Sequence, residues 1–433
     1  MAEWVFPWYS MYMQYLLALT LLLAPTYVVR FNLLGLPTNL LMVWLFLLWL
    51  VFVIWIASTS RFFEFFAWLR SELLTAYCLL LTIFVLAGTA SLFVGGFSQE
   101  KLGQFIVLFL QPIGTFVIVH YLGSIRNWQP ALTRVGRGRL EIGNLLTQAA
   151  LLFVSVAGLY AIIQYFTLIG VPTAWWGNAQ EPKRAVAFFL HPNFYALFVT
   201  PLLGFLIPVV SEQWSVNRID ARPNFQSKLS TVHYTLFTTA AWLLGAVGLL
   251  LSLSRGGWLG LAAAIGVFVL VSGNRWYLKG TAVLFACSLI VVLAVPNFRY
   301  RVLLPFQGEK SSVARFSLWR TGWHMVEDSP LVGKGILGFS NNWTKYNTDP
   351  GLEHYPAPHN IVLNFWVDTG LLGLVSFFGL IVLALKRGWQ NRKNQLALGL
   401  ALACIALVVH GLVDIPYFKN DLALLFWLLY SFI

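Results

Sequence analysis

The sequence predicts an all-α, polytopic membrane protein, and its composition gives the first reason. Of its 433 residues, 59% are hydrophobic and only 10% are charged, with a mean hydropathy of +0.74. A soluble domain of ordinary composition has roughly a quarter of its residues charged. The second reason is a succession of about twelve apolar runs, most of them near the roughly 20 residues that cross a hydrocarbon core of about 30 Å as a helix. We expect one integral membrane domain over residues 1–433.

The apolar runs follow one another without an internal repeat or a linker of low complexity. They lie at residues 13–29, 37–58, 73–96, 103–123, 146–168, 186–210, 232–253, 256–273, 279–296, 360–385, 396–413 and 420–433. The segment MAEWVFPWYS ahead of the first run has no basic stretch and no small-residue cleavage site. We therefore expect the first run to remain as a helix rather than to be removed as a signal peptide. Cys78, Cys287 and Cys404 each lie alone in an apolar run, which favours buried thiols over disulfides or metal ligands.

Lysine and arginine predict the orientation of the helices, because short cytoplasmic loops are enriched in these residues. With the N-terminus inside, the inner loops contain Arg61 and Arg70; Arg126, Arg134, Arg137 and Arg139; Arg218, Arg222 and Lys228; Arg275 and Lys279; and Lys386, Arg387, Arg392 and Lys393. The short outer loops contain fewer, namely Arg30, Lys101, Lys183, Arg184, Arg255 and Lys419. We therefore expect a multi-pass protein of the cytoplasmic (inner) membrane with both termini in the cytoplasm. This distribution accounts for the formal charge of +12 without a nucleic-acid partner.

One long loop, residues 297–359, separates the ninth and tenth runs on the expected outer side. Loops of this length in compact proteins are usually functional or disordered, and its tryptophans favour an ordered loop. Within VARFSLWRTGWHMV (residues 313–326), the residues Phe316, Trp319, Trp323 and Val326 recur at helical spacing. The spacing predicts an amphipathic helix that lies in the membrane interface; a helix that caps the bundle is the alternative.

Four polar segments lie on the expected outer side. They are EPKRAVAFFLHPNFYALF (residues 181–198), SLSRGG (252–257), ARFSLWRTGWHMVEDSPLVGKGILGF (314–339) and YPAPHNIVLNFWVDTGLLGL (355–374). Arginines that converge from separate helices suit a diphosphate, since guanidinium makes paired hydrogen bonds to phosphate oxygens and stays charged. This pattern indicates Arg255, Arg184 and Arg315 as ligands of an anionic headgroup. Gly256 and Gly257 would let that headgroup approach the backbone closely. For Arg255, snorkelling with hydrogen bonds to carbonyls is the alternative.

His359 in PAPHN is the candidate general base. A histidine with its usual pKa of about 6.5 can accept a proton near neutral pH. Asn360 could orient the ring or bind a sugar, and His191 in LHPN shares the ambiguity between a structural and a catalytic role. The sequence has no acidic DxD pair in an outer loop, no HExxH and no Cys/His cluster. We therefore expect no metal and no cofactor, with arginine in the place of a metal ion.

The segments LSRGGWLGL, ARFSLWRTGWHMVEDSPLVGKGILGF and PHNIVLNFWVDTGLLGL resemble the O-antigen ligase family, as do RAVAFFLHPNFYA and HGLVDIPYFKNDLALLFWLL. The resemblance covers roughly residues 145–433. It implies a glycosyltransferase of the GT-C type that works on the periplasmic, outer face of the membrane. Such an enzyme transfers a glycan from undecaprenyl (polyprenyl) diphosphate to an acceptor hydroxyl, with inversion and without a metal. The acceptor would be lipid A-core or a growing polysaccharide.

The resemblance also implies roles for individual residues. Arg255 and Arg315 would bind the donor diphosphate, with Arg184 as a fourth site residue and His359 as the base that activates the acceptor. Arg320 competes with Arg315, which fits better because it precedes Trp319 by four residues. Five residues are left as candidates for contacting the acceptor or orienting the site, namely Asn360, His191, Asn193, Asp414 and Lys419.

Two other functions remain open. A polymerase of the same family would use the same donor and differ only in its acceptor, so the motifs do not separate it from a ligase. A transporter or flippase of lipid-linked or small polar substrates is the alternative from another class. Transporters bind their substrates near the middle of the membrane, whereas the polar segments here gather at one face.

Overall fold

The computed structural model describes residues 2–33, 36–59, 61–72, 75–124, 137–178, 181–216, 225–303 and 310–432. Four of the cations used to predict topology, Arg126, Arg134, Arg218 and Arg222, lie outside the described residues. The chain is mostly helical, as predicted, and every one of the predicted apolar runs contains a helix.

The N-terminal part of the chain contains one departure from the all-α prediction. Its elements are α1 (Ala2–Leu23), the 3-10 helix η1 (Ala24–Val28), β1 (Arg30–Leu33), β2 (Leu36–Asn39), α2 (Leu40–Ser58), α3 (Phe62–Glu72), α4 (Ala76–Ser91), α5 (Gln99–Phe105), the π-helical turn η2 (Ile106–Leu110) and α6 (Gln111–Ser124). The strands β1 and β2 form an antiparallel hairpin in which Arg30 is opposite Asn39. Strands of four residues give too little alternation to detect in a sequence. Asn39 then ends the hairpin and caps α2, because its side chain accepts a hydrogen bond from the N–H of Met42 at 3.0 Å.

The rest of the chain is helical. Its elements are α7 (Arg137–Thr167), the 3-10 helix η3 (Thr173–Trp175), α8 (Pro192–Val216), α9 (Phe225–Leu251), α10 (Arg255–Ser272), α11 (Arg275–Ala294), α12 (Pro296–Leu303), α13 (Lys310–Asp328), α14 (Gly338–Asn341), α15 (Trp343–Tyr346), α16 (Ile361–Gln390), α17 (Gln395–Gly411) and α18 (Asn420–Tyr430).

Seven helical stretches in the described ranges are long and apolar enough to cross a membrane. They are Leu40–Ser58, Gln99–Ser124, Ile142–Thr167, Pro192–Ser211, Val232–Leu251, Arg255–Ser272 and Ile361–Gln390, and the pair α3 and α4 gives an eighth if it counts as one span. Three further apolar helical stretches, Tyr12–Val28, Gln395–Gly411 and Asn420–Tyr430, are shorter. The chain is thus a multi-pass membrane protein, and the number of twelve spans stays a prediction.

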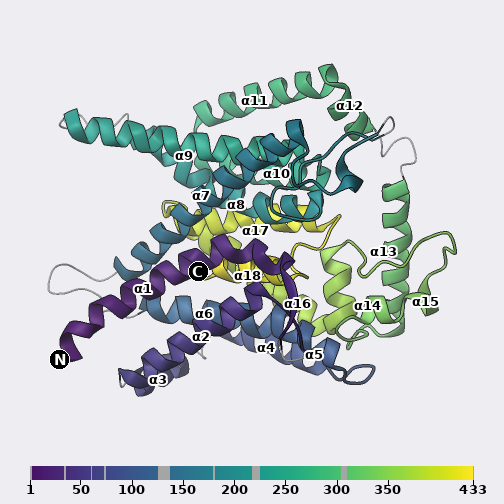
Figure 1. The fold of residues 1–433 in the computed structure, drawn as a ribbon, viewed down its shortest axis with the longest axis horizontal. Coiled ribbons are helices and arrows are strands. Elements are labelled where there is room, and N and C mark those ends of the chain that lie inside the picture. The colour runs from purple at the N-terminus through teal and green to yellow at the C-terminus, as the bar shows by residue number, and fades with distance from the viewer. Residues whose placement is uncertain are drawn as a thin grey trace.

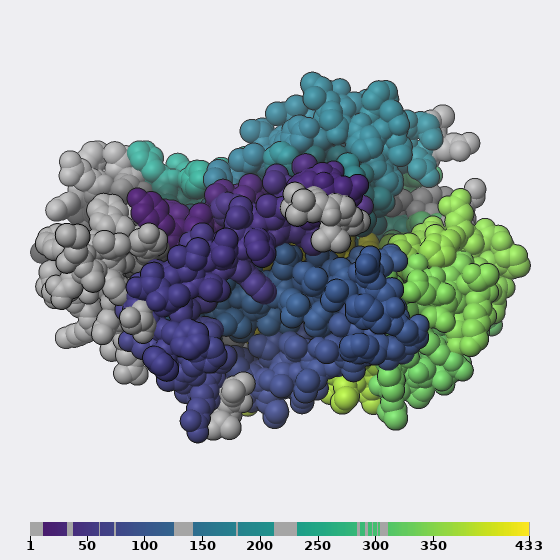
Figure 2. All heavy atoms as spheres, turned by 60° about the horizontal axis from the view of Figure 1, so that its bottom comes forward, coloured from purple at the N-terminus to yellow at the C-terminus, as the bar shows by residue number. Residues whose placement is uncertain are grey.

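The helices pack around α17, which contacts α8, α10 and α16 (Figure 1). The core continues through α7 against α9, α4 against α16 and α6 against α18. The short helices α13, α14 and α15 gather at one end of this bundle, on the right of Figure 1. The space-filling view in Figure 2 shows the same end from another side, with the residues between 310 and 360 in green beyond the blue N-terminal helices. The long loop therefore covers one end of the bundle.

The helix α13 contains the predicted amphipathic segment, but its apolar residues do not form one stripe. Leu318, Met325 and Val326 are buried, and α13 packs against α16. Phe316 and Trp323 instead point outward, with 67% and 48% of their surface exposed. The helix thus caps the bundle with one face and leaves apolar side chains exposed on the other. The helical spacing of Phe316, Trp319, Trp323 and Val326 did not show which of these side chains face the bundle.

The helix α16 is broken at Gly370, where the sequence predicts one continuous run. Gly370 has a φ of +69°, and a Cβ at this position would collide with the carbonyl oxygen of Leu331. The segment around Gly333 fills the break: the N–H of Lys334 donates to the carbonyl of Val367 at 2.6 Å, and the N–H of Leu371 donates to the carbonyl of Leu331 at 3.0 Å. Only glycine combines this φ with such a close approach. The long loop therefore holds the first nine residues of α16, Ile361–Thr369, in place.

Candidate functional site

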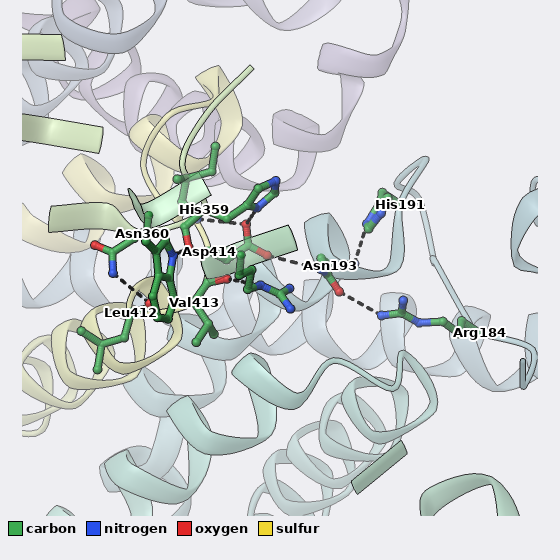
Figure 3. A network of polar contacts seen from close by, with 11 residues as sticks. Arg184, His191, Asn193, His359, Asn360, Leu412, Val413 and Asp414 are labelled. Atoms are coloured by element: carbon green, nitrogen blue, oxygen red, sulfur yellow. Dashed lines mark hydrogen bonds and ion pairs between the residues drawn. The ribbon is translucent and has the colours of Figure 1, made fainter. Parts of the chain in front are cut away.

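The start of α16 and the connection between α17 and α18 bring His359 and Asp414 together. His359 Nδ1 lies 2.9 Å from Asp414 Oδ1 (Figure 3). The backbone of His359 has a φ of +48°, a value that is uncommon for a residue other than glycine and that is found often at functional sites. The next residue fixes this backbone, because the Asn360 side chain caps α16 by accepting from Val362 N–H at 3.0 Å and donates to the Leu412 carbonyl at 3.0 Å.

Asp414 is almost completely enclosed, with 2% of its surface exposed. Its Oδ1 also accepts the N–H of Ile415 at 3.0 Å, and its Oδ2 accepts Asn193 Nδ2 at 3.3 Å. Burial alone would raise the pKa of Asp414, but the hydrogen bond and electrostatic interaction with His359, with smaller contributions from His410 and Arg315, outweigh it and hold that pKa below its usual range. An ionised Asp414 favours a proton on His359 Nδ1, which leaves His359 Nε2 as the nitrogen that can accept a proton.

Of the two competing arginines in α13, the structure brings Arg315 into this cluster. Arg315 Nε donates to the carbonyl of Val413 at 3.0 Å, next to Asp414. Within the described ranges, both terminal nitrogens of Arg315 have no hydrogen-bond partner. Arg320 is five residues further along and about 140° around the helix, and it is exposed.

Arg255 is the first residue of α10, and its neighbours fix where this helix begins. A Cβ on Gly256 would lie 2.5 Å from His410 and 2.9 Å from Val413, and one on Gly257 would lie 2.8 Å from Leu249. These two glycines are buried by protein side chains, so the expectation that they receive a headgroup was wrong. Their small size instead lets α10 pack against its neighbours, with Gly256 against α17 and Gly257 against α8 and α9. The contact of Gly256 brings the start of α10 to Val413, whose carbonyl binds Arg315.

Arg184 lies on the other side of Asn193 from Asp414 (Figure 3). Its Nε donates to the carbonyl of Ser252 at 2.8 Å, and its Nη2 donates to Asn193 Oδ1 at 2.9 Å. Its guanidinium also lies 5.3 Å from the ring centre of Trp175. The predicted segments around residues 184 and 252 are therefore in direct contact.

His191 caps α8, because its Nδ1 accepts the backbone N–H of Asn193 at 3.0 Å. Burial, together with the charge of Arg184, lowers the pKa of His191 to about 4. Its ring is therefore neutral above that pH and remains an acceptor for the cap. The ring also packs edge-to-face on Trp175, with 4.4 Å between the ring centres.

Lys419, at the start of α18, lies in a cage of aromatic side chains. Its Nζ donates to the hydroxyl of Tyr27 at 2.5 Å, lies 3.7 Å from the ring centre of Phe194, and is 3.5 Å from Asp421 Oδ1. Its side chain is 14% exposed. Burial lowers the pKa of Lys419, and the charge of Asp421 opposes this effect. These contacts fasten α18 to α8 and to the segment before β1.

Sequence reasoning gave Asp414 and Asn193 no defined partner and did not identify Val413 and Ser252 at all. The last two contribute backbone carbonyls, which carry no signal in a sequence. Asp414 did have a signal, since it is an acid on the expected outer side, close in sequence to an apolar run. Within the described residues, no three His, Cys, Asp or Glu side chains form a group that could hold a metal ion.

Part of the site lies in a stretch of the chain that is similar to a known family. Residues 240–378 match the Wzy_C family model, which is described as O-antigen ligase, and this range contains Arg255, Arg315 and His359. An uncharacterized protein of Haemophilus influenzae is 25% identical over 208 residues, which cover 43% of this chain and 51% of that protein. The chain thus matches about half the length of this curated relative. The match over residues 240–378 supports the resemblance to the O-antigen ligase family that the motifs show.

Proposed function

We propose that this protein is an inverting, metal-independent glycosyltransferase of the GT-C type that uses a glycan linked to undecaprenyl (polyprenyl) diphosphate. The observation that carries this proposal is the hydrogen bond between His359 and the buried carboxylate of Asp414. Arg315 lies beside this pair, where its Nε donates to the carbonyl of Val413. A base, its orienting acid and cations for an anionic leaving group are the parts that such a transfer needs.

In the proposed reaction, the acceptor hydroxyl attacks the anomeric carbon while His359 Nε2 takes its proton. The bond between the anomeric carbon and the diphosphate oxygen breaks, and the diphosphate leaves with the electron pair. Asp414 stabilises the imidazolium that results, as a buried carboxylate can because it carries the opposite charge. Arg255 and Arg315 neutralise the charge that grows on the diphosphate, which is usually the largest electrostatic contribution to such a step.

The membrane placement is also a proposal. The site lies at the end of the bundle covered by the long loop, which we assign to the periplasmic face of the inner membrane, with both termini in the cytoplasm. The acceptor is lipid A-core for a ligase, or the end of a second lipid-linked glycan for a polymerase. A site at one end of the bundle also argues against a transporter, whose substrate would bind near the middle.

The test is single-turnover transfer from a purified lipid-diphosphate glycan in detergent, with lipid A-core and a second lipid-linked glycan offered as separate acceptors. His359→Ala should lower the transfer rate by about 10²–10⁴-fold, the usual contribution of a general base. His354→Ala is the matched control, since His354 is an exposed histidine of the same loop that contacts only Ser340 and Trp343 among the described residues. Transfer by His359→Ala within about threefold of wild type would refute the proposed base. Absence of transfer by wild type to either acceptor would refute the reaction itself.

A further inference from the structure

We propose that Arg184 and Asn193 are positioning residues for the His359–Asp414 pair, and that Arg184 is not a ligand of the donor diphosphate. The inference rests on the proposed function and changes the role that the sequence predicts for Arg184. The proposal is based on a continuous chain of hydrogen bonds from Arg184 through Asn193 and Asp414 to His359 (Figure 3).

Two hydrogen-bond donors of Arg184 are already bound to protein acceptors. Its Nε and Nη2 lie along one edge of the planar guanidinium, and this edge is one of those that can hold two phosphate oxygens. Here that edge is occupied by the carbonyl of Ser252 at 2.8 Å and by Asn193 Oδ1 at 2.9 Å. Arg315 differs, since only its Nε is bonded and its two terminal nitrogens have no partner among the described residues. Arg315 is therefore equipped for an anionic ligand in a way that Arg184 is not.

Arg184 fixes the orientation of the Asn193 amide. An amide can bind its neighbours in either of two flipped orientations, and its surroundings decide between them. Arg184 can only donate, so the Asn193 oxygen must face it and the Asn193 nitrogen must face Asp414. The cap from His191 Nδ1 to the backbone N–H of Asn193, at 3.0 Å, holds this first turn of α8 in place.

The orientation of the Asn193 amide in turn affects the hydrogen bonds of Asp414 and His359. Asp414 receives Asn193 Nδ2 on Oδ2, and it receives the N–H of Ile415 and the ring of His359 on Oδ1. Every neighbour thus donates to an ionised carboxylate. His359 completes the set only as the tautomer with its proton on Nδ1, which leaves Nε2 free to accept a proton from the acceptor. Arg184 acts on that tautomer through two intermediates, without contact with the substrate.

The experiment is a double-mutant cycle that joins Arg184→Gln and Asn193→Leu to His359→Ala. In the wild-type background each variant should lower the single-turnover rate at saturating donor about tenfold, as expected for loss of one charge-assisted hydrogen bond. In the His359→Ala background neither should lower the residual rate by more than about twofold, because a positioning residue has nothing left to position. A fall of similar size in both backgrounds would overturn the proposal.

The binding of undecaprenyl diphosphate, without a glycan, separates positioning from donor binding. Arg184→Gln should leave this affinity within about twofold of wild type, whereas Arg255→Lys should weaken it about tenfold or more as the reference variant. Loss of affinity in Arg184→Gln as large as in Arg255→Lys would return Arg184 to the donor site. Arg184→Lys is the second variant if Arg184→Gln unfolds, since it keeps the positive charge but lacks the planar guanidinium edge that donates to the Ser252 carbonyl and Asn193 Oδ1 together. An inactive wild type would instead refute the proposed function, so the two failures are distinct.

Discussion

Replacement of Asp414 by asparagine tests the site most directly, because it removes one charge and almost no volume. Both oxygens of the Asp414 carboxylate already accept hydrogen bonds. Oδ1 accepts from His359 and from the N–H of Ile415, and Oδ2 accepts from Asn193. An asparagine amide presents one acceptor and one donor, so it cannot satisfy both sets of donors.

Both orientations of the new amide conflict with the structure. In one orientation the amide nitrogen takes the place of Oδ1, where it faces the N–H of Ile415, so that two donors oppose each other. His359 Nδ1 must then accept a hydrogen bond, which moves the ring proton to Nε2. If its nitrogen faces Asn193, that amide must flip, and its own nitrogen then opposes Arg184. The first orientation removes the base, and the second leaves two donors in contact.

The magnitude follows from the burial of the pair. A hydrogen bond to a charged group contributes about 1.5–3 kcal/mol, which corresponds to about 10- to 150-fold in rate. We expect Asp414→Asn to lower the single-turnover rate by that factor, with the affinity for undecaprenyl diphosphate unchanged. Asp349→Asn is the matched control, since Asp349 is an acid of the long loop that accepts from Ser317 at 3.1 Å, away from the pair. Transfer by a folded Asp414→Asn within about threefold of wild type would refute the reasoning.

Four further predictions concern other parts of the molecule. Arg255→Lys should lose most of its transfer activity while its thermal unfolding midpoint stays near that of wild type, because lysine keeps the charge but lacks the two-pronged geometry; wild-type turnover would make Arg255 structural. Gly370→Ala should lower the unfolding free energy by about 1–3 kcal/mol or more, seen as a lower melting temperature, since alanine fits neither the φ of +69° nor the space at this break. The unfolding free energy of the wild type should fall as the pH drops from about 6.5 toward 4, because His191 is protonated in the unfolded chain over this range but stays neutral in the folded protein, where its pKa is about 4. The unfolding free energy of His191→Asn should fall less over the same range, because asparagine can cap the helix and does not titrate there. A cysteine at Lys345, in a Cys287→Ser background, should react with an impermeant thiol reagent in intact spheroplasts, and labelling only after permeabilisation would reverse the topology.

The sequence allowed the helices and the main site residues to be predicted for a physical reason. Apolar runs must become helices in a bilayer, and an arginine or histidine at the end of such a run is costly enough to need a partner. That reasoning led to Arg255 and His359, although the roles of both residues stay predictions. The motif spacing supplied the preference for Arg315, and the contact with the Val413 carbonyl supports it.

The remainder depends on three-dimensional contacts that a single sequence does not contain. The break at Gly370 arises because the segment near Gly333 fits into it, and those two positions are far apart in the chain. Gly256 and Gly257 looked suited to a headgroup, but the partner that requires their small size is another helix. The contact of Asp414 with His359 forms only when the connection after α17 packs against the start of α16.

The broken helix α16 also suggests how the long loop could be re-engineered. The loop is tied down at one end where Phe339 N–H donates to Asp368 at 3.4 Å, and at the other where His359 meets Asp414. Residues 340–357 are also attached to α13, because Trp343 lies in one buried cluster with Leu318 and Met325, and Asp349 accepts a hydrogen bond from Ser317. A chimera should also keep the segment around Gly333 together with its host helix, because this segment contacts α16 on both sides of the break at Gly370. The unit to exchange between relatives is thus α13, the rest of the long loop and the first part of α16 together.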